Sequence, residues 1–166
     1  MTGEDEIAFA DAAGRFYARH YSFPPVTGRV LGYLGICEPR EQSLAELAET
    51  LRASRSAIAG AVKSLEAMGV VRRARAAGDR MDRVALDPVA ALGRGFDPAE
   101  YRELGDLARQ GLRVLEGASA RRRAVLEETA ALADFLLERI PALRKEWETH
   151  RDELRHSGAL PPLEDR

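Results

Sequence analysis

Residues 43–86 carry, in order, a short helical pattern, a tight break, a second helical pattern and two strand-like runs separated by a glycine turn. In the first pattern Ser43 precedes Glu46 by three residues, a spacing that predicts a capping box at the start of a helix. Apolar residues then recur at helical spacing at Leu44, Leu47, Ala48 and Leu51. This helix therefore has one apolar stripe, which it must bury against a neighbouring element.

The second pattern predicts a helix over residues 55–68, capped by Ser54 and ended by Gly69. One face of this helix is apolar and is formed by Ile58, Ala61, Val62 and Leu65. The other face is short, polar and basic and is formed by Arg55, Ser56, Ala59 and Lys63. Side chains of this kind suit a helix that enters the major groove of DNA, which is about 12 Å wide.

The chain then predicts a hairpin, with a strand over residues 70–75, a turn over residues 76–79 and a returning strand over residues 80–86. In the returning strand Val84 and Leu86 alternate with other residues, so one side of the ribbon can be buried while arginines line its rim. Helix, turn, helix and hairpin in this order predict a winged helix-turn-helix, which is a mainly α fold with a small β-wing.

The charge of the whole chain gives no sign of an anionic partner, because 25 Lys and Arg stand against 27 Asp and Glu, with a net charge of −2. Between Arg52 and Arg83, however, eight basic residues stand against three acidic ones, a local excess of five positive charges. Charge interactions are screened over about 10 Å at about 0.1 M salt, so a local patch is enough to attract phosphates. The alternative is a solvated arginine-rich surface without a partner.

We expect ten residues of this segment to contact double-stranded DNA. Around the second helix these are Arg52, Ser54, Arg55, Ser56, Ala59 and Lys63. On the hairpin they are Arg73, Arg75, Arg80 and Arg83. The hairpin arginines would meet phosphates or a narrow minor groove. Alternation along the strands does not decide which of them point towards DNA.

The residues on either side predict further helices. One is expected over residues 4–20, ending before Pro24, and another over about residues 27–37. Beyond a glycine-rich stretch, Asp97 and Ser119 begin two long amphipathic helices, and Pro141 is expected to kink or restart the second. The apolar faces of these helices are expected to form a two-fold dimer or, alternatively, an intrachain bundle.

The sequence thus divides into five expected segments. They are an N-terminal helix (1–23), a winged helix-turn-helix domain (24–88), a linker (89–96), C-terminal helices (97–156) and a tail expected to be flexible (157–166). We expect the N-terminal helix and the C-terminal helices to carry the dimer contacts.

Other classes of function find no support in the residues. Cys37 is the only cysteine, so an internal disulfide is excluded; burial is the expected role of this thiol, with oxidant sensing as the alternative. The three histidines lack the spacing of a metal site, and neither a phosphate-binding loop nor a nucleophile motif occurs, so we expect no metal, no cofactor and no enzyme activity. Without a long apolar run or a signal-peptide pattern, a cytoplasmic protein with no membrane partner is expected.

Four stretches of the chain resemble the MarR superfamily of bacterial regulators and, within it, the GbsR-like branch. They are residues 28–34 (GRVLGYL), 43–48 (SLAELA), 54–58 (SRSAI) and 62–71 (VKSLEAMGVV). The resemblance implies a homodimeric transcription factor whose terminal helices dimerise. Its second helix would contact the bases, and its wing arginines would contact the flanking DNA. MarR-type wings often carry an Asp-Arg pair that organises the hairpin, and the resemblance implies this role for Asp79-Arg80 or Asp82-Arg83.

The resemblance also raises the question of an effector. Some GbsR-like proteins respond to choline-type ligands, and a quaternary ammonium requires an aromatic cage. Tyr17, Tyr21 and Tyr33 are the candidate ligand-binding residues, with Phe23 and Trp147 as further rings; the alternative is that these rings pack in the core or at a dimer interface.

The predicted function is a homodimer that binds a pseudo-palindromic promoter site and represses transcription by occupying it. The alternative function is a winged-helix protein-interaction module without DNA readout.

Overall fold

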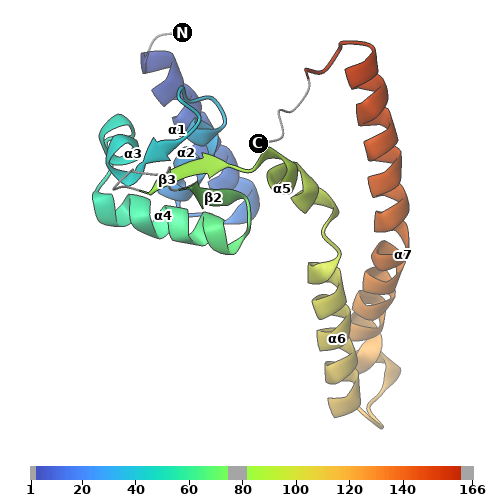
Figure 1. The fold of residues 1–166 in the computed structure, drawn as a ribbon. Helices are drawn as coiled ribbons and strands as arrows, with labels where there is room; N and C mark the ends of the chain where they lie inside the picture. Colours follow the sequence, from blue (N-terminus) through green and yellow to red (C-terminus); the bar gives the residue numbers. More distant parts are fainter. Residues whose placement is uncertain (1–2, 75–81, 162–166) are drawn as a thin grey trace. The chain divides into compact units, whose positions relative to one another are not determined.

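A computed structural model describes residues 3–74 and 82–161 (Figure 1). In chain order the elements are α1 (Gly3–Tyr21), α2 (Pro25–Leu34), β1 (Gln42–Ser43), α3 (Leu44–Thr50), α4 (Arg55–Ala67), β2 (Val71–Ala74), β3 (Arg83–Leu86), α5 (Pro88–Gly93), the 3-10 helix η1 (Arg94–Phe96), α6 (Ala99–Val114) and α7 (Ala120–His156). The mainly α fold with a small β-wing that the sequence predicts is therefore confirmed.

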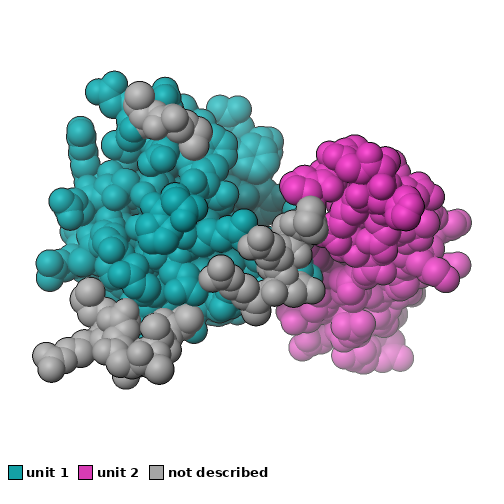
Figure 2. All heavy atoms as spheres, turned by 45° about the horizontal axis from the view of Figure 1, so that its top comes forward, with its two compact units in different colours: residues 1–92 teal, residues 93–166 magenta. Residues whose placement is uncertain are grey.

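The chain forms two compact units, Met1–Leu92 and Gly93–Arg166, which Figure 2 shows in different colours. The first unit holds the helix-turn-helix and the sheet, and the second holds η1, α6 and α7. Each unit has its own internal packing.

The helix-turn-helix forms as its capping residues predict. The Ser43 hydroxyl accepts a hydrogen bond from the Glu46 N–H at 3.2 Å, and the Glu46 carboxylate accepts one from the Ser43 N–H at 2.6 Å, so the predicted capping box is confirmed. After α3, Arg52 adopts a left-handed φ of 48° and turns the chain towards the second helix. Ser54 then caps α4 by accepting from the Ala57 N–H at 3.2 Å, and Gly69 ends it with a φ of 72°.

The sheet has three antiparallel strands in the order β1-β3-β2. The register pairs Arg73 with Val84 across the hairpin and Ser43 with Arg83 on the other side of β3. The sequence analysis did not predict β1, because a strand of two residues shows no alternation and exists only through its pairing with β3. The predicted turn and two of the predicted contact residues, Arg75 and Arg80, lie outside the described residues.

The core of the first unit is built from large side chains of α2, α3, α4 and β3. Those that are fully buried are Val30, Leu47, Leu51, Ile58, Val62, Leu65 and Val84. The helices α1 and α2 cross at glycines, and a Cβ added at Gly14 would lie 2.7 Å from the Arg29 side chain. An ion pair of 2.7 Å between Arg29 and Asp11 joins the same two helices. This packing fixes the scaffold that holds α3 and α4.

The segment expected to be a linker, residues 89–96, contains most of α5 and all of η1. Pro88 begins α5, and the Asp87 carboxylate accepts a hydrogen bond from the Ala90 N–H at 2.9 Å. The Asp87-Pro88 pair is thus an N-terminal cap followed by a proline at the first helical position, where a missing N–H costs nothing. In the second unit α7 runs from Ala120 to His156 as one helix that contains Pro141, so the helix does not restart there.

Candidate nucleic-acid interface

Helix α4 separates its side chains into a buried face and an outward face. Ile58, Ala61, Val62 and Leu65 are buried against the core of the first unit. Of the outward residues that the sequence predicted, Arg55, Ser56 and Lys63 are exposed and Ala59 is half-buried. Figure 1 shows the three-stranded sheet next to this helix, and β2 contacts α4 directly.

The N-terminus of α4 brings together several of the predicted contact residues. The hydroxyls of Ser54 and Ser56 lie 3.1 Å apart, and Ser54 also accepts the Ala57 N–H, so its first role is structural. Arg55, the first residue of α4, is exposed, and so is Arg52 in the turn before it. Two exposed arginines therefore lie within the residues that begin α4, and both a cation and a helix N-terminus favour an anionic partner.

Gly60 lies in the middle of α4 without a packing reason. Glycine inside a helix costs about 1 kcal/mol relative to alanine. In α2, a Cβ at Gly28 would lie 2.9 Å from the Tyr17 Cβ, and one at Gly32 would clash with the Ala13 Cβ. A Cβ at Gly60 would meet nothing within 4 Å. No side chain projects from the outward face of α4 at this position, which leaves room for close approach of a partner.

The described wing arginines that the sequence predicted as DNA contacts are engaged within the chain. The Arg73 Nε lies 2.8 Å from the Glu66 carboxylate of α4, and its Nη1 lies 3.9 Å from Asp82. The Arg83 Nη1 donates to the Glu41 carbonyl at 3.1 Å and to the Glu46 carboxylate at 3.2 Å. Of the two Asp-Arg pairs that the resemblance implied, Asp79-Arg80 lies outside the described residues. Asp82 lies near Arg73, and Arg83 pairs with Glu46, while both residues also make further interactions.

Glu46 is the electrostatic centre of the junction between α3 and β3. The hydrogen bond from the Ser43 N–H lowers the pKa of its carboxyl below the ordinary value, with the Ser43 hydroxyl and the Arg83 guanidinium acting in the same direction. An ionised Glu46 therefore caps α3 and holds Arg83 of the wing at the same time.

Arg72, the second residue of β2, was not among the predicted contact residues. It is exposed on β2, opposite Ala85 in the register, and its neighbour Val71 is buried. No ion pair or hydrogen bond of its side chain occurs within residues 3–74 and 82–161. The signal available in the sequence was the alternation of β2, which places Arg72 on the side away from Val71.

The candidate ligand-binding tyrosines do not form one group. Tyr33 is 6% exposed and belongs to the core, where burial raises its pKa. Tyr17 and Tyr21 lie at the end of α1 with ring centroids 5.6 Å apart, and Phe23 stacks on Tyr17 at 5.8 Å. Trp147 lies on α7 in the second unit. The first unit thus offers a small cluster of mutually packed rings rather than three rings around a common centre.

Cys37 is 4% exposed, and burial raises the pKa of its thiol to about 11. A thiol with so high a pKa holds little of the reactive thiolate at neutral pH. The expectation that Cys37 is a buried residue is therefore confirmed.

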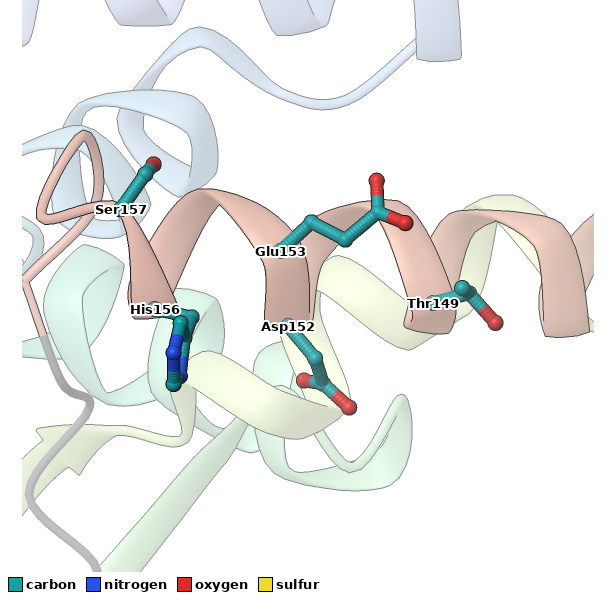
Figure 3. Close-up of a pocket in the computed structure, with 5 residues that line it drawn as sticks. All are labelled: Thr149, Asp152, Glu153, His156 and Ser157. Carbon is teal, nitrogen blue, oxygen red and sulfur yellow. The ribbon is translucent and has the colours of Figure 1, made fainter.

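A surface hollow lies along the last turns of α7 and is lined by Thr149, Asp152, Glu153, His156 and Ser157 (Figure 3). Figure 3 shows that these side chains leave the helix in different directions and do not converge on one point. Across the described residues no group of three His, Cys, Asp or Glu side chains could hold a metal ion. Within the same part of the chain, no helix is long and apolar enough to cross a membrane.

Comparison with known proteins connects this geometry to a family. The HTH-type transcriptional regulator MmpR5 of Mycobacterium tuberculosis is 35% identical over 133 residues, which are 80% of this chain and 80% of that protein. The chain belongs to the MarR family of transcriptional regulators. The MarR family description matches residues 21–80, and that of the MmpR5-like MarR family transcriptional regulators matches residues 97–150.

A solved structure described as a transcriptional regulator supports the same assignment. It is 30% identical in sequence, and the match covers 87% of this chain and 99% of that one with a TM-score of 0.78. MarR regulators are non-enzymatic DNA-binding proteins that act as dimers, so the predictions of a transcriptional regulator and of a protein without enzyme activity are confirmed.

Proposed function

We propose that this MarR regulator is a homodimer that binds a pseudo-palindromic promoter site through α4 and represses transcription by occupying it. The observation that carries the proposal is the outward face of α4, where Arg55 and Lys63 are exposed around the open position Gly60. Because no side chain projects at Gly60, this face can approach base edges closely, and its two cations can contact phosphates.

The contact residues on this face have different roles in the proposal. Arg55, Ser56 and Lys63 reach base edges or phosphates in the major groove, with Ala59 as an apolar contact. Arg52 meets a phosphate beside the groove, while Ser54 holds the helix N-terminus in place. Arg75 and Arg80 remain proposed wing contacts that lie outside the described residues. A two-fold dimer presents two such faces to half-sites about 34 Å apart.

The dimer is supported by apolar side chains that the second unit leaves exposed. On α6, Leu107 and Val114 are seven residues apart and 65% and 81% exposed. On α7, Val125 and Leu132 are seven residues apart and 73% and 53% exposed. Rows of this spacing form one stripe on a helix, and exposed stripes of this kind are typical of an interface. A second copy of the chain is the proposed partner.

The finer assignments stay predictions. The match of residues 97–150 to MmpR5-like regulators supports a place near that group, whereas the GbsR-like branch predicted from the sequence has no comparable support. An effector held by Tyr17 and Tyr21 is a proposal that calorimetry with choline or betaine tests, and the absence of heat with either removes it. A cytoplasmic location follows from the proposed role on chromosomal DNA.

The test of the proposed function is a fluorescence anisotropy titration. The protein is titrated against the DNA that flanks its own gene and against a scrambled duplex, at several salt concentrations. Tight binding to the native duplex with a clear margin over the scrambled one supports the proposal. Equal and steeply salt-dependent binding to both leaves only phosphate attraction. Absence of binding favours the alternative of a protein-interaction module.

A matched pair of variants connects the binding to α4. Lys63→Ala removes an exposed cation from the proposed DNA face, whereas Lys145→Ala removes one from the exposed surface of α7. We expect Lys63→Ala to weaken binding and to lower the salt slope by about one unit for each bound subunit, with Lys145→Ala unchanged. Equal effects of the two substitutions would contradict the assignment of α4 as the DNA-contacting helix.

A further inference from the structure

The base of the wing is held by two ion pairs that join it to both helices of the helix-turn-helix. Arg73 on β2 pairs with Glu66 near the end of α4, and Arg83 on β3 pairs with Glu46 at the start of α3. The two arginines lie on different strands, and the two glutamates lie on different helices. Each strand of the hairpin thus has its own connection to the body of the domain.

The contact of Arg83 is more than an isolated surface pair. One nitrogen, Nη1, bonds both the Glu41 carbonyl at 3.1 Å and the Glu46 carboxylate at 3.2 Å. That carboxylate also accepts the Ser43 N–H, and Ser43 pairs with Arg83 in the β1–β3 register. The strand pairing, the capping box and the guanidinium therefore share one small network, and the side chain of Arg83 is only 27% exposed. A guanidinium held in this way cannot reach a phosphate without breaking the network.

Arg73 makes an ion pair to the other helix from the neighbouring strand β2. Its Nε lies 2.8 Å from Glu66, and the two side chains are 35% and 29% exposed. Asp82, in the chain just before β3, adds a second carboxylate at 3.9 Å. Arg73 therefore connects β2 to α4 and to the residue before β3, and two acidic groups lie close to its positive charge.

Arg72 differs from both. It follows the buried Val71 on β2, its side chain is exposed, and the described part of the chain offers it no acidic partner. An unpaired guanidinium can exchange its counterions for a phosphate without first losing an intrachain ion pair.

We propose that Arg73 and Arg83 are positioning residues that fix the base of the wing to α4 and α3, and that Arg72 is a wing arginine that contacts DNA phosphate. The inference rests on the proposed function, because the role of Arg72 requires that the protein binds DNA. It reassigns two of the four wing arginines predicted from the sequence and adds one that the prediction left out.

The experiment compares Arg72→Gln, Arg73→Gln and Arg83→Gln in the full-length protein, with thermal unfolding and anisotropy against the native and scrambled duplexes at several salt concentrations. For Arg72→Gln we expect an unchanged melting temperature, a similar loss on both duplexes and a salt slope lower by about one unit for each bound subunit. For Arg73→Gln and Arg83→Gln we expect a melting temperature lower by about 1–4 °C, affinity weaker by about 2- to 5-fold and an unchanged salt slope.

A charge exchange provides the rescue control. In the double variant Arg73→Glu with Glu66→Arg, the ion pair is reversed while the net charge of the wing base stays the same. A positioning role predicts that the double variant recovers the affinity and melting temperature lost in Arg73→Gln. A phosphate contact predicts that affinity stays low, because a glutamate then stands at the contact position.

The outcomes separate the inference from the proposed function. A lower salt slope for Arg73→Gln or Arg83→Gln, or an unchanged slope for Arg72→Gln, overturns the corresponding assignment. If the unaltered protein binds neither duplex, the proposed function fails and the assignment of Arg72 fails with it. The positioning role is then decided by the melting temperatures alone, and equal melting temperatures for all three variants overturn it.

Discussion

The two units of the protein use their apolar residues in opposite ways. In the first unit, large side chains such as Leu47, Ile58 and Leu65 are fully buried. In the second unit the buried residues are mostly small, namely Gly105, Ala108, Ala133 and Ile140. Leu107, Val114 and Val125 are at least 65% exposed. The first unit therefore has a core of its own, whereas the second exposes large apolar side chains that another protein surface could cover.

The glycines of α6 explain why the second unit packs in this way. A Cβ at Gly105 would lie 3.1 Å from the Ala133 Cβ, and one at Gly111 would lie 2.7 Å from the Leu126 Cδ1. The two helices approach each other through these small residues, so the leucines and valines beside them point elsewhere. Close packing within the chain and an exposed apolar stripe outside it are two results of the same sequence pattern.

The largest effect is expected from truncating the core of the first unit. Leu65→Ala removes a fully buried side chain and should lower the free energy of unfolding by about 2–5 kcal/mol, because a cavity is left behind. The matched control is Leu92→Ala in the same unit, where the side chain is 55% exposed and the cost should stay within about 0.5 kcal/mol. Urea denaturation followed by circular dichroism measures both. Similar losses for the two variants would show that the first unit does not depend on its own core.

The next effect concerns the exposed stripe of the second unit. Val125→Asp combined with Leu132→Asp places two charges on the proposed dimer surface and should raise the dimer dissociation constant at least about 30-fold, the effect of losing about 2 kcal/mol of interface energy. Sedimentation equilibrium over a range of concentrations measures the change. Thr149→Asp, on an exposed polar position of α7, is the control and should leave the mass unchanged. A double variant that stays dimeric would place the interface on another surface.

The sequence predicted those parts of the fold that depend on neighbours along the chain. The capping box at Ser43, the cap at Ser54 and the turn at Gly69 are local, and each occurs where its spacing predicts. The helix over residues 88–93 was not predicted, although a local signal was present: Asp87 before a proline can cap a helix, and it does so here.

The parts that could not be predicted depend on contacts between distant residues. β1 exists only because β3 pairs with it, and the paired residues Gln42 and Val84 are 42 positions apart in the chain. The partner of Arg83 is 37 residues away, so nothing in the sequence near Arg83 indicates that its charge is already engaged. The sequence also shows no sign that Tyr33, unlike Tyr21, is buried in the core. The candidate contact residues on α4 follow from helical spacing, whereas the roles of the wing arginines required the three-dimensional partners.

The smallest effect tests the junction at Glu46, where one carboxylate of the first unit both caps α3 and pairs with Arg83 of the wing. The pKa of Glu46 is lowered in the folded protein, chiefly by the Ser43 N–H, so its contribution to stability is present above the ordinary carboxyl pKa. That contribution is lost as the pH falls through the lower, folded-state value. Glu46→Gln keeps the hydrogen-bonding shape of the capping box but removes the charge, and should cost about 0.2–1 kcal/mol near neutral pH, since the side chain is partly exposed to solvent.

The loss in Glu46→Gln should therefore shrink as the solution is acidified, because the wild-type carboxylate becomes protonated as well. Thermal unfolding at about pH 7 and about pH 3 gives the comparison, and Glu49→Gln on the exposed side of the same helix is the control, with no loss at either pH. If Glu46→Gln were as costly at the acidic pH as at neutral pH, the ionised carboxylate would not be what joins α3 to the wing. The shape of the capping box alone would then account for the stability of this junction.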